Sequence, residues 1–282
     1  MPGGGASVRR ALEELGARPR KGLGQHFLVD DGVLARQLSA ASLSREDTVL
    51  EVGAGLGTLT QELARLAGHV VAYETDRRLA GALEGRLPAN VRLLPEDALE
   101  ADWPPFTKFV ANVPYGISSP LLFRLLDHGF ELAVVLLQRE FADRLAAAPR
   151  TKDYGRLTVA CARVAAVELL EVVPPSAFWP PPRVDSALVR ITPRRGFEVA
   201  DVAVFDAMLR TVFSQRRKML RNSLAGARAA LAPGVAEEEW RGFLAGMERS
   251  ASRPEELAPA ELGRLADDIT ALGGWTRTRD RQ

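Results

Sequence analysis

The sequence predicts an α/β protein, with a doubly wound, Rossmann-like sheet followed by a small α-helical C-terminal domain. Three observations predict this class. Short apolar runs alternate with helical patterns as far as residue 193, a glycine-rich turn (GAGLG, 53–57) follows one of the first such runs, and no strand pattern follows residue 196. We therefore expect one domain over 1–195 and a second over 196–282.

The elements can be placed one by one from the spacing of apolar residues. Strands are expected over 48–55, 69–76, 91–97, 106–113, 131–138, 162–173 and 185–193. Helices are expected over 58–67, 77–87, from Ser119 or Pro120 onward, and in the C-terminal part over 205–224, 236–247 and 265–272. The run ELAVVLLQ (131–138) is almost continuously apolar, so that strand should be buried on both faces.

Composition and length restrict the class of protein. The chain has 282 residues, of which 46% are hydrophobic and 26% charged, as in an ordinary globular protein. No apolar run approaches the ~20 residues that span a bilayer. The first 22 residues have no apolar core, which argues against a secretory signal and favours a cytoplasmic protein. The single cysteine, Cys161, excludes an internal disulfide and a metal site built on cysteines.

Charge is unevenly distributed although the net charge is only +1. Residues 205–228 contain six basic side chains against Asp206, and Lys21 is the last of five basic residues near the N-terminus, whereas 237–268 is mostly acidic. Local basic surfaces of this kind suit a polyanion such as nucleic acid. For a single cluster, a solvated helix face is the simpler interpretation.

Polar residues follow three successive predicted strands. Gly53, Gly55 and Gly57 form G-x-G-x-G, which differs from the dinucleotide fingerprint G-x-G-x-x-G and is expected where no pyrophosphate must be bound. Glu74 can accept both ribose hydroxyls of a nucleoside, and Asp97 can accept a hydrogen bond from an adenine amino group. Alone, Glu74 could be a solvated acid and Asp97 a helix cap. Together on one rim of the sheet, the three features predict a nucleoside site.

The segment ANVPYGISSP (111–120) joins a predicted strand to a predicted helix. The Asn112 side-chain oxygen and the backbone carbonyl before Pro114 can accept hydrogen bonds from an exocyclic amine, whose lone pair is otherwise delocalised into its ring. Proline stiffens the turn. Tyr115 offers a ring on which a flipped-out base can stack. The alternative is an ordinary turn, which explains the composition but not the aromatic residue after the proline.

A second segment, SAFWPPPRVDSALV (176–189), carries Phe178 and Trp179 directly before three prolines. A stiff proline run can hold an aromatic ring against the other side of a base. A packed connector between strands is the alternative interpretation.

Taken together, these motifs resemble those of the small-subunit (16S) ribosomal RNA adenine N6-dimethyltransferases. The resemblance covers nearly the whole chain, in the order GLGQHFL (22–28), EVGAGLGTLT (51–60), YETD (73–76), EDAL (96–99), NVPYGISSP (112–120), FWPPPRVDSAL (178–188) and FSQRRKMLRNSL (213–224). It implies a seven-stranded S-adenosylmethionine-dependent methyltransferase sheet with a helical C-terminal domain that contributes to rRNA binding. It also implies dimethylation of two adjacent adenosines in the 3′-terminal hairpin of 16S rRNA, late in 30S subunit assembly.

The resemblance also implies roles for individual residues. Cofactor contacts are implied at His26, Leu28, Gly53, Glu74, Asp97 and Asn112, with Gln25 and Gly55 beside them. Base handling is implied for Asn112, Pro114, Tyr115 and Phe178, and rRNA contacts for Arg216, Arg217, Lys218 and Arg221 on a basic helix over 213–224. His26 stands where many members have Asn, and Val113 and Gly116 replace the usual Leu and Asn. We expect a monomer that binds 16S rRNA within the 30S subunit or its precursor, with no metal and no membrane.

Three alternative functions share parts of this pattern. A related methyltransferase could modify an adenine of large-subunit rRNA, although the SQRRKMLRNSL motif favours the small-subunit family. A non-catalytic assembly or transcription factor could retain the fold, but Glu74, Asp97, Asn112, Pro114 and Tyr115 are all present. A nicotinamide oxidoreductase does not fit the G-x-G-x-G spacing.

Overall fold

The computed structural model describes residues 5–20, 22 and 24–273, so Lys21 of the N-terminal basic residues and Leu23 of the GLGQHFL motif lie outside the described residues. Contacts divide the chain into two compact units, one formed by 1–143 with 166–193 and the other by 144–165 with 194–282. The domain boundary at 195/196 stays a prediction. The contacts place the residues that follow this boundary in the second unit, and they also assign 144–165 to that unit.

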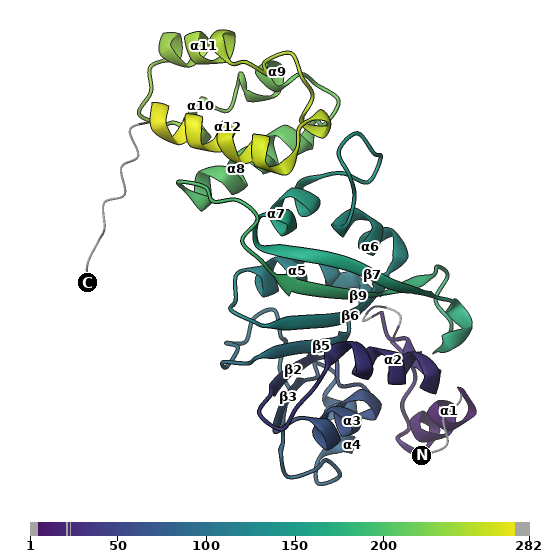
Figure 1. Ribbon diagram of the computed structural model, residues 1–282. Helices are drawn as coiled ribbons and strands as arrows, with labels where there is room; N and C mark the ends of the chain where they lie inside the picture. Colours follow the sequence, from purple (N-terminus) through teal and green to yellow (C-terminus); the bar gives the residue numbers. More distant parts are fainter. Residues whose placement is uncertain (1–4, 21, 23, 274–282) are drawn as a thin grey trace. The chain divides into compact units, whose positions relative to one another are not determined.

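The first unit is built on a seven-stranded sheet in the order β4-β3-β2-β5-β6-β9-β7 (Figure 1). Its strands are β2 (Thr48–Val52), β3 (His69–Tyr73), β4 (Val91–Leu94), β5 (Lys108–Asn112), β6 (Leu132–Gln138), β7 (Ala165–Val173) and β9 (Ser186–Pro193). Neighbours from β4 to β6 run parallel, and β9 is antiparallel to β6. This is the Rossmann-like sheet of seven strands that the sequence predicts. Residues 133–137 of β6 are all buried, as their continuous apolar run predicts.

Helices of the first unit follow the strands along the chain. They are α1 (Gly5–Glu14), α2 (Asp31–Ala41), α3 (Thr58–Leu66), α4 (Arg77–Leu83), α5 (Ser118–Leu126) and the start of α6 (Arg139–Leu145). Aspartates begin two of them: Asp30 accepts the backbone N–H of Val33 at 3.0 Å, and Asp76 accepts that of Arg78 at 3.1 Å. These caps fix where the chain turns from the sheet edge into each helix.

Two short strands connect segments that lie far apart in the sequence. β1 (Phe27–Leu28) pairs antiparallel with β8 (Phe178–Trp179), placing Leu28 opposite Phe178. This pair brings the N-terminal GLGQHFL motif beside the FWPPP segment.

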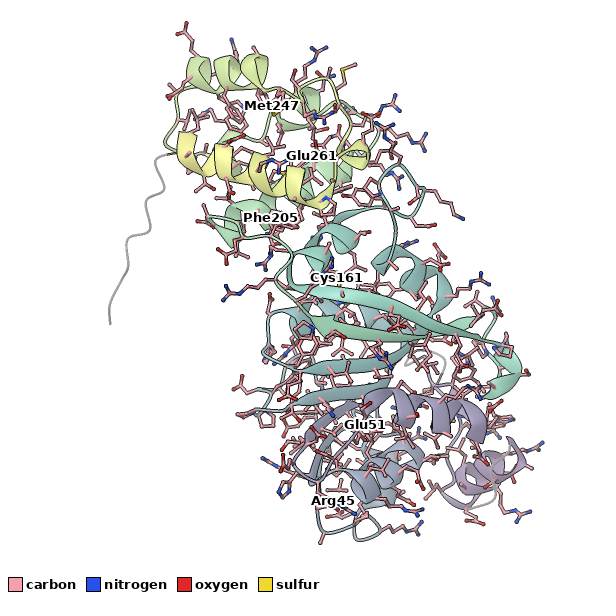
Figure 2. All side chains as sticks on the ribbon, in the orientation of Figure 1. Arg45, Glu51, Cys161, Phe205, Met247 and Glu261 are labelled. Atoms are coloured by element: carbon pink, nitrogen blue, oxygen red, sulfur yellow. The ribbon has the colours of Figure 1, made fainter. Side chains whose placement is uncertain are left out.

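The second unit is helical. It contains α7 (Arg156–Val164), α8 (Val202–Ser214), α9 (Leu220–Leu224), α10 (Arg228–Leu231), α11 (Glu237–Gly246) and α12 (Pro259–Leu272). α12 contacts both α7 and α8, and the large side chains of Tyr154, Phe205 and Trp240 are fully buried (Figure 2 labels Phe205). A Cβ at Gly263 would lie 2.6 Å from the ring of Phe197, so only glycine allows that approach.

Several predicted limits differ from the structure. The strands expected over 48–55, 69–76 and 91–97 end at Val52, Tyr73 and Leu94, and the helix expected over 77–87 ends at Leu83. Two further predictions are wrong for reasons that local spacing does not show. The strand expected over 162–173 begins only at Ala165, because 162–164 complete α7; the apolar run passes through this boundary without a break, so its spacing does not mark it. The basic helix expected over 213–224 is interrupted. α8 ends at Ser214, 215–219 form a turn, and the N–H of Leu220 instead donates to the Ser252 carbonyl.

Within the described ranges, none of the helices has the length and apolar character needed to cross a bilayer.

Candidate active site

The glycine turn after β2 packs against the Asn112–Tyr115 segment. Gly53 and Gly55 have φ angles of 88° and 59°, in the left-handed region that favours glycine. A Cβ at Gly53 would lie 3.4 Å from the Pro114 ring and 3.8 Å from the Asn112 carbonyl oxygen. Two motifs that are about sixty residues apart in the sequence therefore meet, and a bulkier turn would close the space between them.

Glu74 holds this turn in place. It directly follows β3, is 5% exposed, and accepts the N–H of Gly55 at 2.7 Å with one carboxylate oxygen and that of Asp76 at 2.8 Å with the other. Burial raises the pKa of Glu74, and the two backbone N–H groups act in the opposite direction. Each oxygen still has a free lone pair for a ligand hydroxyl.

Asp97 makes a local turn bond, but it is not the helix cap of the alternative interpretation, because the described residues between β4 and β5 form no helix. One oxygen of its exposed carboxylate accepts the N–H of Leu99 at 2.9 Å, as in an Asx turn. The residue nevertheless lines the same cavity as Glu74 and Gly53. This turn bond and ligand binding are therefore compatible at the same residue.

Asn112 ends β5 with an unsatisfied acceptor. Its side-chain oxygen is buried and has no hydrogen-bond partner among the described residues. The next residue, Val113, is fixed by its N–H donating to the Leu136 carbonyl at 3.2 Å. Leaving such a buried acceptor unpaired costs about 1–3 kcal/mol, so a ligand that brings an N–H donor to this oxygen would remove the penalty.

Two aromatic rings meet beside Asn112. The rings of His26 and Tyr115 are stacked, with centroids 5.6 Å apart and an interplanar angle of 28°. His26 is itself fixed by a 2.6 Å hydrogen bond between Nδ1 and the Pro180 carbonyl. Phe178 is 5% exposed and lines the same cavity. Tyr115 and Phe178, from distant segments, thus come together at one site, with one ring face of Tyr115 against His26.

The eleven site residues predicted in the first unit all line a single cavity. They are Gln25, His26, Leu28, Gly53, Gly55, Glu74, Asp97, Asn112, Pro114, Tyr115 and Phe178. Gln25 is oriented there by donating to Asp76 at 3.3 Å and accepting the N–H of Arg20 at 2.8 Å. Over the described part of the chain, no group of three or more His, Cys, Asp or Glu side chains is placed to hold a metal ion.

Glu51 is a cavity residue that the sequence analysis missed. It lies on β2 (labelled in Figure 2), is 1% exposed, and neither carboxylate oxygen has a hydrogen-bond partner among the described residues. Burial raises its pKa to about 8 against the opposing effect of the nearby Thr60 hydroxyl, and the Glu74 charge adds a smaller increase. The available signal was an acid inside the apolar strand TVLEV (48–52), where a charged side chain is rare unless it has a function.

Comparison with known proteins identifies the family. Residues 16–238 match the protein family described as "Ribosomal RNA adenine dimethylase". The chain belongs to the ribosomal RNA adenine dimethylase family. It is therefore an S-adenosylmethionine-dependent rRNA adenine dimethyltransferase, as the resemblance of its motifs implies.

Individual relatives agree with this assignment. A Methanosarcina mazei protein named "Probable ribosomal RNA small subunit methyltransferase A" is 44% identical over 258 residues, covering 88% of this chain and 92% of the relative. One of the same name from Methanothermobacter thermautotrophicus is 40% identical over 277 residues, covering 97% and 99%.

Solved structures show the same fold. A dimethyladenosine transferase from Plasmodium falciparum has a TM-score of 0.77 at 28% identity, covering 88% of this chain and 98% of that one. The 23S rRNA methyltransferase ErmE has a TM-score of 0.63 at 31% identity, covering 86% and 99%. The sheet of this dimethylase is thus the methyltransferase sheet that the sequence predicts.

The cavity of the dimethylase suits S-adenosylmethionine. Buried acceptors without partners, on Glu51 and Asn112, require N–H donors, which the ammonium and adenine amino groups of this cofactor and the target amine can supply. Glu74 would accept hydrogen bonds from the ribose hydroxyls, and a Cβ at Gly53 or Gly55 would narrow the space beside the turn. When bound, the cofactor supplies an electrophilic methyl group.

The basic residues predicted to bind RNA are not equivalent. In the second unit, Arg216 is held by Glu255 at 2.7 Å and donates to the carbonyls of Thr151 and Lys152. The side chains of Arg217, Lys218 and Arg221 are exposed and make no hydrogen bond or ion pair with described residues. Arg216 therefore has a structural role, and the other three are available for phosphates.

Proposed function

We propose that this dimethylase modifies the two adjacent adenosines in the 3′-terminal hairpin of small-subunit rRNA. The names of the two curated relatives from Methanosarcina mazei and Methanothermobacter thermautotrophicus support this target. The observation that carries the proposal is the buried, unpartnered Asn112 oxygen beside the glycine turn. An adenine amine can donate a hydrogen bond to that oxygen, whereas a turn with no ligand would leave the buried oxygen unpaired.

The residues of the site would act mainly by position. The Asn112 oxygen accepts a hydrogen bond from the adenine amino group. This bond favours the geometry in which the lone pair of the amino nitrogen points out of the ring plane. Tyr115 and Phe178 hold the flipped base by its faces. As the nitrogen gains a methyl group, it becomes a cation whose proton is acidic and passes to solvent, so no dedicated base is required. After the first transfer, one N–H remains for a second cycle at the same nitrogen.

We further propose that the substrate is the 30S subunit or its precursor, that the enzyme acts as a monomer without a metal, and that it works in the cytoplasm, where ribosomal subunits assemble. The exposed basic residues Arg217, Lys218 and Arg221 support binding to a large RNA.

The experiment is a methylation assay on purified 30S and 50S subunits from a strain that lacks these methyl groups. The expected result is two dimethyladenosines in the 3′-terminal hairpin of the small-subunit rRNA, mapped by mass spectrometry. Modification of the large subunit alone would overturn the proposal and favour the second candidate, a large-subunit methyltransferase, for which the similarity to ErmE is the specific observation. A failure to methylate either subunit would overturn the proposed substrate.

A further inference from the structure

A second cavity of about 1180 Å³ lies beside the active site. The two cavities share Gln25, His26 and Tyr115. The remaining walls of the second come from α1 with the segment 16–19, from 179–184, and from Gln138 at the end of β6. Small-molecule sites usually measure about 300–1,000 Å³, so this space suits a polymer segment that continues out of the active site.

The charges of this cavity favour an anion. Arg18 and Arg183 line it, are exposed, and have no hydrogen-bond or ion-pair partner among the described residues. Arg9 also lines it, but is paired at 2.9 Å with Glu13, the one acidic residue in the described walls. Two unpaired arginines therefore face the same space, and guanidinium groups bind phosphates with paired hydrogen bonds.

The remaining wall is apolar and stiff. It contains Trp179, the three prolines 180–182, and Val184, which is 47% exposed. The Pro180 carbonyl is bonded to His26, which ties this wall to the ring stacked on Tyr115. Apolar and aromatic surface interleaved with arginines is typical of sites for single-stranded nucleic acid, where bases lie on the surface and the backbone follows the charges.

We propose that this cavity binds the rRNA nucleotide directly adjoining the adenosine under modification, with Arg18 and Arg183 on the phosphates of that strand. This inference rests on the proposed function. When one of two adjacent adenosines occupies the active site, its neighbour must lie next to Tyr115, where the second cavity begins. The cavity would thus keep the unmodified or newly modified neighbour in register.

The test is the double variant Arg18→Gln/Arg183→Gln, compared with Arg65→Gln/Arg86→Gln. The control pair carries the same change of charge, is also exposed, and lines neither cavity. Each protein is assayed for methyl transfer to unmethylated 30S subunits over a range of salt, with S-adenosylmethionine affinity measured by calorimetry and folding by thermal melting. The conservative variant Arg18→Lys/Arg183→Lys retains the charge.

We expect the Gln double variant to raise KM for 30S subunits about tenfold. The slope of log KM against log salt concentration should become smaller by about 1.4, the contribution of two single-strand phosphate contacts. Cofactor affinity and melting temperature should match the control, and the Lys variant should recover most of the slope. If the cavity variant behaves as the control does while the wild type methylates 30S subunits, this inference alone is overturned. If the wild type does not methylate 30S subunits, the proposed function fails and the inference fails with it.

Discussion

The phenol oxygen of Tyr115 lies 2.6 Å from the hydroxyl oxygen of Ser186, a fully buried residue at the start of β9. Ser186 is paired in the sheet with Gln138 of β6, so its position is fixed by the core. Burial raises the pKa of Tyr115, and the bond to Ser186 acts in the opposite direction. The phenol therefore stays neutral near pH 7, and its ring is held at one end by the sheet while His26 covers one face.

Removing this bond should slow methyl transfer without affecting the cofactor. In Ser186→Ala the Tyr115 ring loses its anchor, and we expect kcat to fall about 3- to 10-fold because the base is held less well in the reactive geometry. In Tyr115→Phe, kcat should fall by a similar factor. The double variant should be no slower than either single variant, because each substitution removes the same Tyr115–Ser186 hydrogen bond. A loss of kcat in the double variant equal to the product of the two single losses would show that Tyr115 and Ser186 act independently. Calorimetry should show unchanged S-adenosylmethionine affinity.

Asn112→Ala should abolish transfer while the cofactor still binds. The substitution removes the acceptor for the adenine amine, a group comparable to a lost oxyanion-hole donor, for which losses of about 10²–10³ are usual. Single-turnover transfer to 30S subunits measures this directly, and S-adenosylmethionine affinity should weaken by less than about tenfold. Loss of cofactor binding as large as the loss of rate would show that Asn112 serves the cofactor and not the amine.

Much of the first unit follows from local patterns. Its parallel strands are short and apolar, with β6 buried on both faces, so periodicity locates them, and their carboxyl ends collect Gly53, Glu74, Asp97 and Asn112 at one rim. What local pattern does not provide is long-range pairing. β1 and β8 have two residues each, and neither reads as a strand alone, yet their pairing brings Leu28 to Phe178.

Two further features depend on tertiary contacts. The turn at 215–219 is hidden in an apolar spacing that continues from α8 into α9, because the break is stabilised by Ser252, which is remote in sequence. Arg216 reads as one basic residue of a cluster, whereas its partner Glu255 comes from a 3-10 helix (Pro254–Glu256) that is distant in sequence. The same basic pattern therefore contains one structural arginine and three exposed residues.

Glu74→Ala should mainly weaken S-adenosylmethionine binding. The change removes the carboxylate expected on the ribose hydroxyls and also the acceptor of the Gly55 N–H, so the glycine turn loses its support. We expect a 10- to 100-fold increase in Kd by calorimetry, the equivalent of about 1.4–2.8 kcal/mol. Glu84→Ala, which removes an exposed acid at the end of α4, is the matched control. Normal cofactor affinity in Glu74→Ala would rule out the ribose role.

The basic cluster of the second unit should separate into two kinds of residue. Replacing Arg217, Lys218 and Arg221 together by Gln should weaken binding to 30S subunits and lower the salt slope by about two, because each phosphate contact releases counterions. Arg216→Gln should leave the slope unchanged and instead lower the free energy of unfolding by about 1 kcal/mol, through loss of its pair with Glu255. Filter binding across a salt series and urea unfolding measure the two effects. A triple variant with the wild-type slope would exclude these residues from the RNA interface.

The free energy of unfolding of the cofactor-free protein should fall as pH rises from about 5 to 8.5, because of Glu51. Its pKa is raised to about 8 in the folded state from an ordinary 4.5, so between these values the folded protein holds a proton that the unfolded chain has released. Stability is therefore lost as pH rises through this window, by an amount on the order of 5 kcal/mol when complete. Glu51→Gln carries no ionisable group and should remove this part of the pH dependence, leaving the variant more stable than wild type at pH 8.5. Urea unfolding at pH 5 and 8.5 measures the difference, and saturating S-adenosylmethionine should reduce it in the wild type by supplying donors to the carboxylate. Equal pH slopes in the two proteins would show that Glu51 ionises freely in the fold.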